Sequence, residues 1–479
     1  MIFKSETIAA IATALSDSGI GIVRVSGEEA IAVVNKIYRS KGKAVLTDYE
    51  SHTIHYGFIY DGEDLIDEVM VSVFKAPRSY TTEDTVEINC HGGVLVVNKV
   101  LETVIKNGAR IAEPGEFTKR AFLNGRIDLS KAEAVMDMIH AKNEFALKSS
   151  VKQIRGSLSR LIKELRAEIL YEIAFIESAL DDPEHISLDG YHEKLSKKTD
   201  SLIARVNKLY LSADNGKMLK EGINTVIVGK PNAGKSSLLN RLVGEEKAIV
   251  TEIAGTTRDV IEESIRLSGI GLNIIDTAGI RNTEDRVEKI GVERAKEYAL
   301  DADLIIYVVD SSVELDNSDL DIMNLIQGKK VIVLLNKTDL KTIVTDEEIK
   351  EKLNANIIKN DWGNVESSES INQNIKVIKT STKEGFGMEE LEDTIKDMFF
   401  QGELQINDEV VLTNMRQKDA VKDALDSLYM VKRSLEDEMP EDFLSIDLMG
   451  AYSSLGYVIG EEIGEDVVNE IFSKFCMGK

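Results

Sequence analysis

The chain contains few cysteines and histidines and no long apolar run. Its 479 residues include two cysteines, Cys90 and Cys476, and six histidines without metal-ligand spacing. Two thiols cannot support a disulfide framework, so we expect a reducing cytosol and no structural zinc. No apolar run approaches the roughly 18 residues that cross a bilayer, and residues 1–21 lack the basic-then-apolar pattern of a signal peptide. These absences predict a soluble, cytoplasmic protein.

Positive charge is also scarce. The chain has 83 acidic and 58 basic residues, which gives a formal net charge of −25. A surface coated with phosphate contacts needs an excess of lysine and arginine. Any nucleic-acid surface must therefore be a local patch or be shared with a partner.

The chain does contain a phosphate-binding loop. Residues 229–237 read GKPNAGKSS and lie between a β-branched run typical of a buried strand and the start of an apolar helical pattern. Gly229 and Gly234 let the backbone curl so that successive N–H groups point at phosphate oxygens. Lys235 is expected to reach the β- and γ-phosphates, and Ser236 to supply a hydroxyl to Mg²⁺. The protein is therefore predicted to bind a nucleotide.

Three further motifs follow in the order that a guanine-nucleotide domain needs. Residues 276–279 read DTAG, where Asp276 would hold the metal through water and the Gly279 N–H would meet the γ-phosphate. Residues 336–339 read NKTD, and this motif resembles the NKxD of translation-factor-like GTPases. Its carboxylate accepts from the N1–H and exocyclic amine of guanine, so it selects GTP over ATP. Residues 380–383, TSTK, occupy the place of a base-backing SAK loop, with threonine instead of alanine.

The group that orients the nucleophilic water is missing from its usual place. The position after Gly279, a glutamine in Ras-like proteins, is Ile280, whose aliphatic side chain cannot orient water. The catalytic polar group must come from elsewhere. Thr257 is predicted to be the switch hydroxyl that closes on Mg²⁺, and Arg258 beside it stays open as a built-in arginine finger.

The pattern of apolar residues divides the chain into four segments. Residues 1–125 alternate β-rich runs with two helical stretches, an α+β pattern, and residues 126–220 become continuously helical. Residues 221–399 hold the nucleotide motifs, and residues 400–479 return to helix. We therefore predict a multidomain α/β and α+β protein in which a Ras-like P-loop GTPase domain is inserted into one helical domain, whose two parts pack through apolar stripes.

Motifs from both ends of the chain and from its middle carry a family resemblance. They are SYTTED at 79–84, HGG at 91–93, GAR at 108–110, PGEFT at 114–118, RAFLNGR at 120–126, GTTRD at 255–259 and FCMGK at 475–479. The P-loop, GTTRD and the C-terminal motif rarely occur together elsewhere. The chain therefore resembles the MnmE (TrmE) family of tRNA-modification GTPases from end to end.

The resemblance implies a cofactor and two kinds of partner. It implies a homodimer joined through N-terminal domains that resemble tetrahydrofolate-binding folds. It also implies a heterotetramer or larger complex with an MnmG (GidA)-like protein, which alone would carry FAD and NADH. The pair would add an aminomethyl or carboxymethylaminomethyl group at C5 of the wobble uridine of certain tRNAs. The carbon would come from a 5-formyl- or 5,10-methylene-tetrahydrofolate.

The resemblance further implies that K⁺ beside the phosphates does the work of an arginine finger, while G domains pair across the dimer. Asn232 matches the family's K⁺-ligating asparagine. Thr251, Ile253 and Thr256 lie in the segment that matches its K⁺-binding loop. A ring of oxygen ligands, including backbone carbonyls, suits this cation.

Glu288 matches the family's glutamate that orients the attacking water through a bridging one. Read by itself, Glu288 would be a solvated helical charge, and it is Ile280 together with the resemblance that favours a catalytic role. We predict Glu288, Lys235 and Thr257 as catalytic residues, with Mg²⁺ held by Ser236 and Thr257. The predicted GTP-binding residues are Asn232, Ala233, Gly234, Lys235, Ser236, Ser237, Thr251, Glu252, Ile253, Ala254, Gly255, Thr256, Thr257, Asp276, Thr277, Ala278, Gly279, Asn336, Lys337, Thr338, Asp339, Ser381, Thr382 and Lys383.

A folate site is assigned by match to the family. It comprises Arg24, Glu87, Arg126 and Lys479, because basic groups suit the glutamate tail and a carboxylate suits the pterin amines. Read alone, Arg24 and Glu87 would form a cross-strand ion pair. Cys476 stays open between a nucleophile and a packed thiol, since no histidine lies nearby in sequence to lower its pKa.

Three functions from different classes follow from these observations. The first is an enzyme of wobble-uridine modification that is driven by GTP hydrolysis. The second is a regulatory or ribosome-assembly GTPase, which needs no folate and no N-terminal α+β domain. The third is a folate-binding scaffold with a vestigial GTPase, which the complete nucleotide motifs disfavour.

Overall fold

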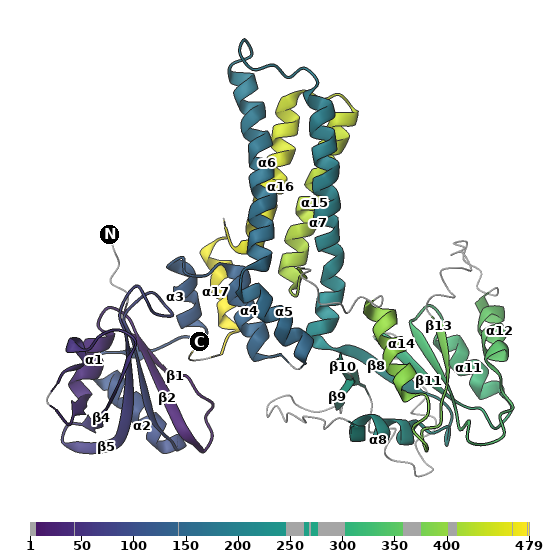
Figure 1. Ribbon diagram of the computed structural model, residues 1–479, viewed down its shortest axis with the longest axis horizontal. Coiled ribbons are helices and arrows are strands. Elements are labelled where there is room, and N and C mark those ends of the chain that lie inside the picture. Colours follow the sequence, from purple (N-terminus) through teal and green to yellow (C-terminus); the bar gives the residue numbers. More distant parts are fainter. Residues whose placement is uncertain are drawn as a thin grey trace. The chain divides into compact units, whose positions relative to one another are not determined.

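The computed structural model describes most of the chain (Figure 1). The described residues are 6–42, 44–141, 143–245, 263–267, 270–275, 302–357, 375–400, 410–461, 463–476 and 478. They fall into two compact units. The first comprises Met1–Ile139, Val151–Val206 and Asp419–Lys479, and the second His140–Ser150 and Asn207–Lys418. Within the described residues, every helix is too short or too polar to cross a membrane.

The N-terminal part of the first unit is a seven-stranded sheet with two helices on one face. In sheet order the strands are β3 (Tyr38–Ser40), β4 (Thr53–Asp61), β5 (Asp64–Phe74), β6 (Thr85–Gly92), β2 (Ser18–Ser26), β1 (Ile8–Ile11) and β7 (Arg110–Ile111). All neighbours are antiparallel except β1 and β7. Helices α1 (Ala30–Ile37) and α2 (Val94–Lys106) cover the face that carries Val69, Val71 and Val73, and a short 3₁₀ helix spans Leu46–Asp48. Alternation along the strands puts the apolar residues on this face.

The second face of this sheet is covered only at one end. A third short helix, α3 (Glu116–Leu123), which the sequence pattern did not indicate, places Phe117 against Ile8 and Ala10 of β1. On the same face, Ile54 of β4 is 61% exposed and Met70 of β5 is 52% exposed. The sheet therefore has one closed face and one partly open face.

The rest of the first unit is helical. Its helices are α4 (Leu129–Ile139), α6 (Ser157–Asp181), α16 (Glu441–Ile459) and α17 (Glu465–Ser473), together with parts of α5 (Glu144–Ile154), α7 (Tyr191–Glu221) and α15 (Met415–Glu436). The long helices α6, α7, α15 and α16 run alongside one another (Figure 1). Buried Arg166 of α6 donates to the Tyr452 carbonyl of α16 at 3.1 Å and pairs with Glu461. The two predicted parts of the helical domain thus pack together, which confirms the insertion, although the first part is broken into separate helices, for example at Gly156, where φ is 83°.

The second unit contains a six-stranded α/β sheet, which confirms the predicted Ras-like fold. In sheet order the strands are β13 (Ile375–Lys379), β12 (Val331–Asn336), β11 (Leu304–Asp310), β8 (Ile223–Val228), β10 (Ile270–Ile274) and β9 (Glu263–Leu267). Only β9 is antiparallel to its neighbour. The described helices are α8 (Lys235–Glu245), α11 (Asn317–Leu325), α12 (Asp346–Ile357) and α14 (Met388–Phe400). Ile227 packs into the core on one face of β8 and Val226 into the core on the other, as expected of a buried parallel strand.

Candidate functional site

The phosphate-binding loop joins central strand β8 to helix α8. Gly229 and Gly234 have φ of 151° and 107°, in the region that favours glycine. At Gly234 a Cβ atom would lie 2.1 Å from Asn336 Nδ2, so no side chain fits there. Because α8 begins at Lys235, the loop delivers its backbone to the positive end of a helix, at the carboxyl end of a parallel strand.

Lys235 lies within this loop. Its Nζ donates to the carbonyl oxygens of Gly229 at 2.7 Å and Lys230 at 2.8 Å. Burial lowers the pKa of Lys235. The ammonium is thus held by the backbone of the loop in which a phosphate would bind, and Ser236 follows it in the first turn of α8.

Asn336 connects three of the predicted motifs. It is 1% exposed at the end of β12, and its Nδ2 donates to the Ala233 carbonyl of the phosphate-binding loop at 2.8 Å. Its Oδ1 accepts from the Thr382 N–H of the TSTK segment at 3.0 Å. The structure therefore brings together the GKPNAGKSS, NKTD and TSTK segments, which are far apart in sequence.

Asp339 lies beside a pocket of about 390 Å³, a size typical of small-ligand sites. Ser381 Oγ donates to Asp339 Oδ1 at 2.8 Å, and the Thr338 N–H donates to the Thr380 carbonyl at 3.2 Å. Lys337, with a φ of 63°, turns back to pair with Asp310 at 2.6 Å. The pocket is lined by Thr338, Asp339, Thr342, Lys379, Ser381, Glu384 and Phe386. It can offer a carboxylate and an aromatic edge to a flat, hydrogen-bonding ligand.

The remaining predicted nucleotide residues lie outside the described part of the chain. They are Thr251, Glu252, Ile253, Ala254, Gly255, Thr256, Thr257, Asp276, Thr277, Ala278, Gly279 and Glu288, with Arg258 and Ile280. Their roles in binding Mg²⁺ or K⁺ and in catalysis stay predictions.

Lys230 is a residue whose role sequence reasoning missed. Its Nζ pairs with Asp319 at 2.7 Å and Asp316 at 3.0 Å, and Asp319 also accepts from the buried Tyr307 hydroxyl at 2.9 Å. Asp316 caps α11 through a capping box. The Asp-x-x-Asp spacing is a signal for the start of α11, but nothing in it points to a lysine of the phosphate-binding loop. This ion pair anchors the loop to α11.

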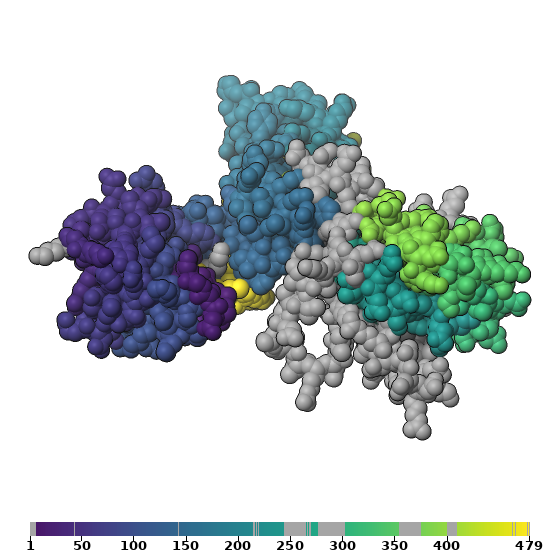
Figure 2. Space-filling view, turned by 60° about the horizontal axis from the view of Figure 1, so that its bottom comes forward, coloured from purple at the N-terminus to yellow at the C-terminus, as the bar shows by residue number. Residues whose placement is uncertain are grey.

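The predicted folate residues Arg24 and Glu87 lie directly opposite each other on β2 and β6. Arg24 Nε and Glu87 Oε1 are 2.8 Å apart, so the cross-strand ion pair does form. Arg24 Nη1 also donates to the Gly478 carbonyl at 3.0 Å. The C-terminal segment, yellow in Figure 2, therefore lies against the N-terminal sheet at this pair, although Lys479 itself is outside the described residues.

Tyr80 of the SYTTED motif brings the two predicted arginines together. The Arg126 guanidinium lies 4.9 Å from the centre of the Tyr80 ring, and that of Arg24 lies 5.8 Å from it. Arg126 Nη1 also donates to the Tyr80 carbonyl at 3.2 Å, and the Tyr80 hydroxyl lies 3.0 Å from Thr118 Oγ1. The result is a tyrosine ring flanked by two cations, on the partly open face of the sheet.

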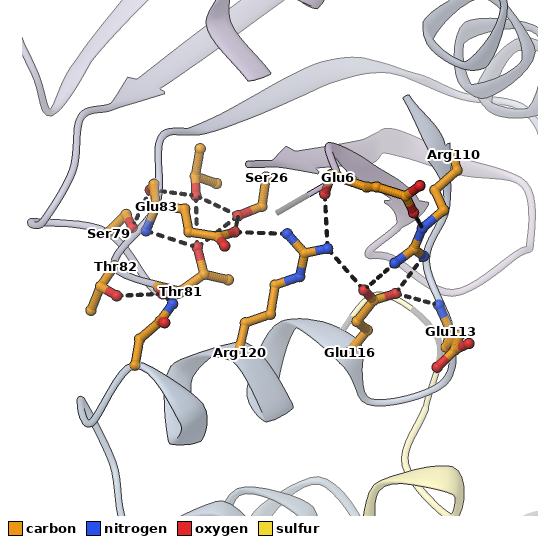
Figure 3. A network of polar contacts seen from close by, with 12 residues as sticks. Glu6, Ser26, Ser79, Thr81, Thr82, Glu83, Arg110, Glu113, Glu116 and Arg120 are labelled. Carbon is orange, nitrogen blue, oxygen red and sulfur yellow. Dashed lines mark hydrogen bonds and ion pairs between the residues drawn. The ribbon is translucent and has the colours of Figure 1, made fainter. Parts of the chain in front are cut away.

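A largely buried ionic network joins Glu83, three residues after Tyr80, to Arg120 and Glu116 (Figure 3). Arg120 donates to Glu83 at 2.9 Å, to Glu116 at 2.9 Å and to the Glu6 carbonyl at 2.8 Å, and Arg110 binds Glu116 at 2.7 Å. Burial by itself would raise the pKa of Glu116, but hydrogen bonds from Arg110, the Glu113 N–H and Arg120 hold it at about 2. Glu116 is therefore ionised in the folded protein at neutral pH.

The same network fixes the segment that carries Tyr80. Ser26 Oγ donates to Glu83 Oε2 at 3.2 Å and lies 2.6 Å from Thr81 Oγ1 (Figure 3). Asn124 Nδ2 donates to the Thr81 carbonyl at 2.7 Å. Residues on both sides of Thr82 are thus tied to β2 and to the end of α3, and Tyr80 is held in place.

The two cysteines have different environments. Cys90 is buried, and burial raises its pKa to about 11. Cys476 is exposed, so the interpretation as a packed thiol is wrong. Its carbonyl accepts from the Gly115 N–H at 3.3 Å, which places the exposed thiol next to the start of α3.

The fold and the phosphate-binding loop define the class of this protein, a P-loop protein of the Ras-like GTPase type. Comparison with known proteins then gives its family. Residues 129–476 match the family model of the MnmE helical domain, and residues 7–126 match that of the GTP-binding protein TrmE N-terminus. The chain belongs to the MnmE (TrmE) family, as its motifs predict.

Individual relatives match over their whole length. The tRNA modification GTPase MnmE of Lachnoclostridium phytofermentans is 55% identical over 477 residues, which covers 99% of this chain and 100% of that protein. The protein of the same name from Clostridioides difficile is 47% identical and covers 100% of both chains. Among solved structures, a variant of Aquifex aeolicus Era bound to GDP·AlF4⁻ is 26% identical over 43% of this chain and 67% of that chain, with a TM-score of 0.26.

Proposed function

We propose that this chain is a GTP-hydrolysing enzyme of tRNA modification that depends on K⁺. With a flavin-dependent MnmG-like partner it adds a (carboxymethyl)aminomethyl group at C5 of the wobble uridine of certain tRNAs. Membership of the MnmE family supports both the GTPase activity and the tRNA substrate. The single structural observation that carries the nucleotide assignment is the Asn336 contact, which unites the phosphate-binding loop with the base-recognition motifs.

The site suits a guanine nucleotide with Mg²⁺. The phosphates would bind at the amino end of α8, where the backbone N–H groups and Lys235 supply positive charge, and the Ser236 hydroxyl would be a ligand of Mg²⁺. Guanine would enter the pocket beside Asp339, whose carboxylate accepts two hydrogen bonds from that base. Ser381 orients the same carboxylate through its hydrogen bond.

The K⁺ assignment rests on Asn232 among the described residues. Its left-handed φ of 60° is a conformation that asparagine tolerates better than most residues, and its side chain is exposed on the loop. Together with Thr251, Ile253 and Thr256 it would offer oxygen ligands to the cation. A bound K⁺ supplies positive charge beside the transferring phosphoryl group, as an arginine finger does. Glu288 would orient the attacking water.

GTP turnover in K⁺ compared with Na⁺ tests this assignment. We expect hydrolysis by the full chain to be at least tenfold faster in K⁺, and Asn232→Ala to remove most of that difference. Asn240→Ala, an exposed asparagine on α8, is the matched control and should keep it. A wild-type rate that does not depend on the cation would exclude the K⁺ site.

The N-terminal site fits a folate by its donor chemistry. Arg126 can bind a carboxylate of the glutamate tail, Glu87 in its pair with Arg24 can accept from pterin amines, and the Tyr80 ring offers a stacking surface. Lys479 would add a further cation. The bound folate would supply the one-carbon unit for transfer.

Calorimetry of the full chain with 5-formyl-tetrahydrofolate tests the folate site. We expect Arg126→Met to weaken binding at least tenfold, because it removes one of the two cations at Tyr80. Arg39→Met is the control, since Arg39 lies in the same domain, pairs with the exposed Glu63 and is far from the site in sheet order. Equal binding by the Arg126 and Arg39 variants would exclude this site.

A homodimer through the N-terminal domains is also proposed. The open sheet face presents Ile54, Tyr56 and Met70, with Tyr56 and Met70 directly opposite each other on β4 and β5. A second copy of this surface would cover them. Sedimentation should give a dimer for the wild-type chain and a monomer for Tyr56→Lys with Met70→Lys. A wild-type monomer would contradict the proposal.

The tRNA product is tested in cells. Nucleosides of tRNA from a deletion strain should lack the C5-substituted wobble uridine, and the wild-type gene should restore it whereas the Lys235→Ala variant should not. Unchanged nucleosides in the deletion strain would favour a regulatory GTPase instead. Copurification of the chain with a flavoprotein tests the partner assignment.

A further inference from the structure

The turn between α5 and α6 carries a run of positive charge. From Val151 to Lys163 the sequence has four basic residues, Lys152, Arg155, Arg160 and Lys163, and no acidic residue, whereas the whole chain carries a net charge of −25. Three of these residues, Arg155, Arg160 and Lys163, together with Lys131 of α4, are called the basic turn below. All four belong to the first compact unit.

The backbone gathers these residues around Gly156. Helix α5 ends at Ile154, Gly156 adopts a left-handed φ of 83°, and α6 begins at Ser157. Lys131 of α4 reaches the same point, because a Cβ atom on Gly156 would lie 3.0 Å from Lys131 Cε. Residues from two separate helices therefore meet at one turn.

The basic side chains of α6 lie on its outer face. Leu158, Ile162 and Leu165 are fully buried, while Arg160 and Lys163 are exposed and three residues apart. Residues at this spacing share one side of a helix. Arg155, in the turn before them, is also exposed.

Most of these charges are not neutralised by neighbours. In the part of the chain that the structure describes, Arg155, Arg160 and Lys163 form no ion pair, and Lys131 pairs with Asp128 at 3.1 Å. Glu164 is the nearest acidic residue in sequence on α6. Some basic residues elsewhere in the same unit do have carboxylate partners, as Lys432 has Asp200 and Lys474 has Glu470.

From this cluster we infer that the basic turn is a contact surface for the phosphate backbone of RNA. The inference rests on the proposed function, in which tRNA is the substrate. A chain with so large a negative charge repels a polyanion over most of its surface, so productive contact needs a local excess of cations. Arg155 and Arg160 suit this role because guanidinium groups bind phosphate in a bidentate manner.

Salt-dependent binding of tRNA to the full chain tests the inference. Fluorescence anisotropy with a transcribed tRNA, from 50 to 200 mM KCl, gives the affinity and its slope against salt. The Arg155→Gln, Arg160→Gln double variant should bind at least tenfold more weakly at low salt. Its slope should fall by about 1.5, since each lost phosphate contact removes roughly 0.7–0.9.

A control variant separates a local contact from the change in total charge. Arg433→Gln with Lys474→Gln removes the same two charges from exposed positions on α15 and just after α17, and it should bind tRNA as the wild type does. GTP hydrolysis without tRNA should be unchanged in both variants, which shows that the chain is folded. Equal affinities and slopes for the two double variants would overturn the inference, as would a wild-type chain that binds no tRNA at 50 mM KCl. Loss of the proposed function has a separate signature, unchanged nucleosides in the deletion strain.

Discussion

The two sheets of this protein place functional residues in different ways. The N-terminal sheet is mostly antiparallel and has a partly open face, so Arg24 and Glu87 point outward from the middle of β2 and β6. The sheet of the GTPase domain is mostly parallel and buried on both faces, so its candidate residues lie beyond the strand ends, at Lys235 and Asn336. Sheet type therefore decides whether a site forms on a face or at an edge.

The two sites are also stabilised by different interactions. Behind the N-terminal site lies a network of buried ions centred on Arg120 and Glu116. At the nucleotide site the contact that joins the three motifs is neutral, from the Asn336 amide to backbone groups, and ion pairs of Lys230 and Lys337 lie beside it. A buried charge left without its partner is costly, so a single substitution in the Arg120–Glu116 network should lower the stability of the N-terminal site. A single substitution of a residue that contacts the nucleotide, such as Lys235, should instead change GTP binding or hydrolysis.

The largest effect is expected from Arg120→Met. It leaves Glu83 and Glu116 with less compensation inside the protein, which should lower the local free energy of unfolding by about 3–5 kcal/mol. Hydrogen exchange of residues 79–84 and 110–124 in the full chain measures this. Arg39→Met, which removes surface contacts to Glu63, the Gly62 carbonyl and the Tyr60 ring, should cost less than about 1 kcal/mol. Equal protection in the two variants would show that the buried network does not stabilise the Tyr80 segment.

Lys235→Ala should act on chemistry with little effect on folding. Removing the cation that stabilises charge on the transferring phosphoryl group should lower kcat for GTP by about 10²–10³. Lys396→Ala, which disrupts a partly exposed pair with Asp393 on α14, is the control and should be active. A Lys235 variant that hydrolyses GTP as fast as this control would contradict the role assigned to the phosphate-binding loop. Weaker folate binding by the Lys235 variant would show that the substitution also affects the N-terminal site.

Asp339→Asn should change which base is preferred. The asparagine amide offers a donor where guanine also has a donor, so GTP affinity should fall by about 1.5–3 kcal/mol, the size of a hydrogen bond to a charged group. Xanthosine triphosphate, which has an acceptor at that position, should bind better than GTP. Competition binding measures the two affinities, and an unchanged order of preference would place the base elsewhere.

The smallest effect on stability is expected from lowering the pH. The pKa of Glu116 is about 2, below its ordinary value of 4.5, so its ion pairs stabilise the folded state above about pH 4.5. That stability is lost as the pH falls through about 2. The protection of residues 110–124 against hydrogen exchange, corrected for the intrinsic exchange rate at each pH, should therefore decrease as the pH falls between these two values, and Glu116→Gln should show a weaker pH dependence there. An identical pH dependence in the variant would mean that other groups control acid stability.

Periodicity in the sequence located several strands and the nucleotide loop. The β-branched run predicted before residue 229 is β8, and the β-rich runs predicted within residues 1–125 include β2, β5 and β6. These predictions succeeded because a strand's apolar pattern depends only on its own few residues. Of the candidate sites, the loop and its motif order followed from sequence alone.

Contacts between segments that are distant in sequence could not be predicted from the sequence. Arg120 meets Glu83, and Lys230 meets Asp319, through the fold and without any regular spacing. The helix α3 was missed because its eight residues are too few to show a clear period. Tyr80 was part of a recognised motif, but its place between Arg24 and Arg126 needed the sheet register and the C-terminal end of α3.

The pairing of Arg24 with Glu87 also limits how this sequence can change in length. Side chains alternate between the two faces of a strand, so one residue inserted into β2 before Arg24 would turn the arginine into the apolar core beneath α1 and α2. Glu87 would then face outward alone. Insertions in the turn between β4 and β5 have no such effect. Related sequences should therefore vary in length in that turn, and keep the number of residues within β2 and β6 constant.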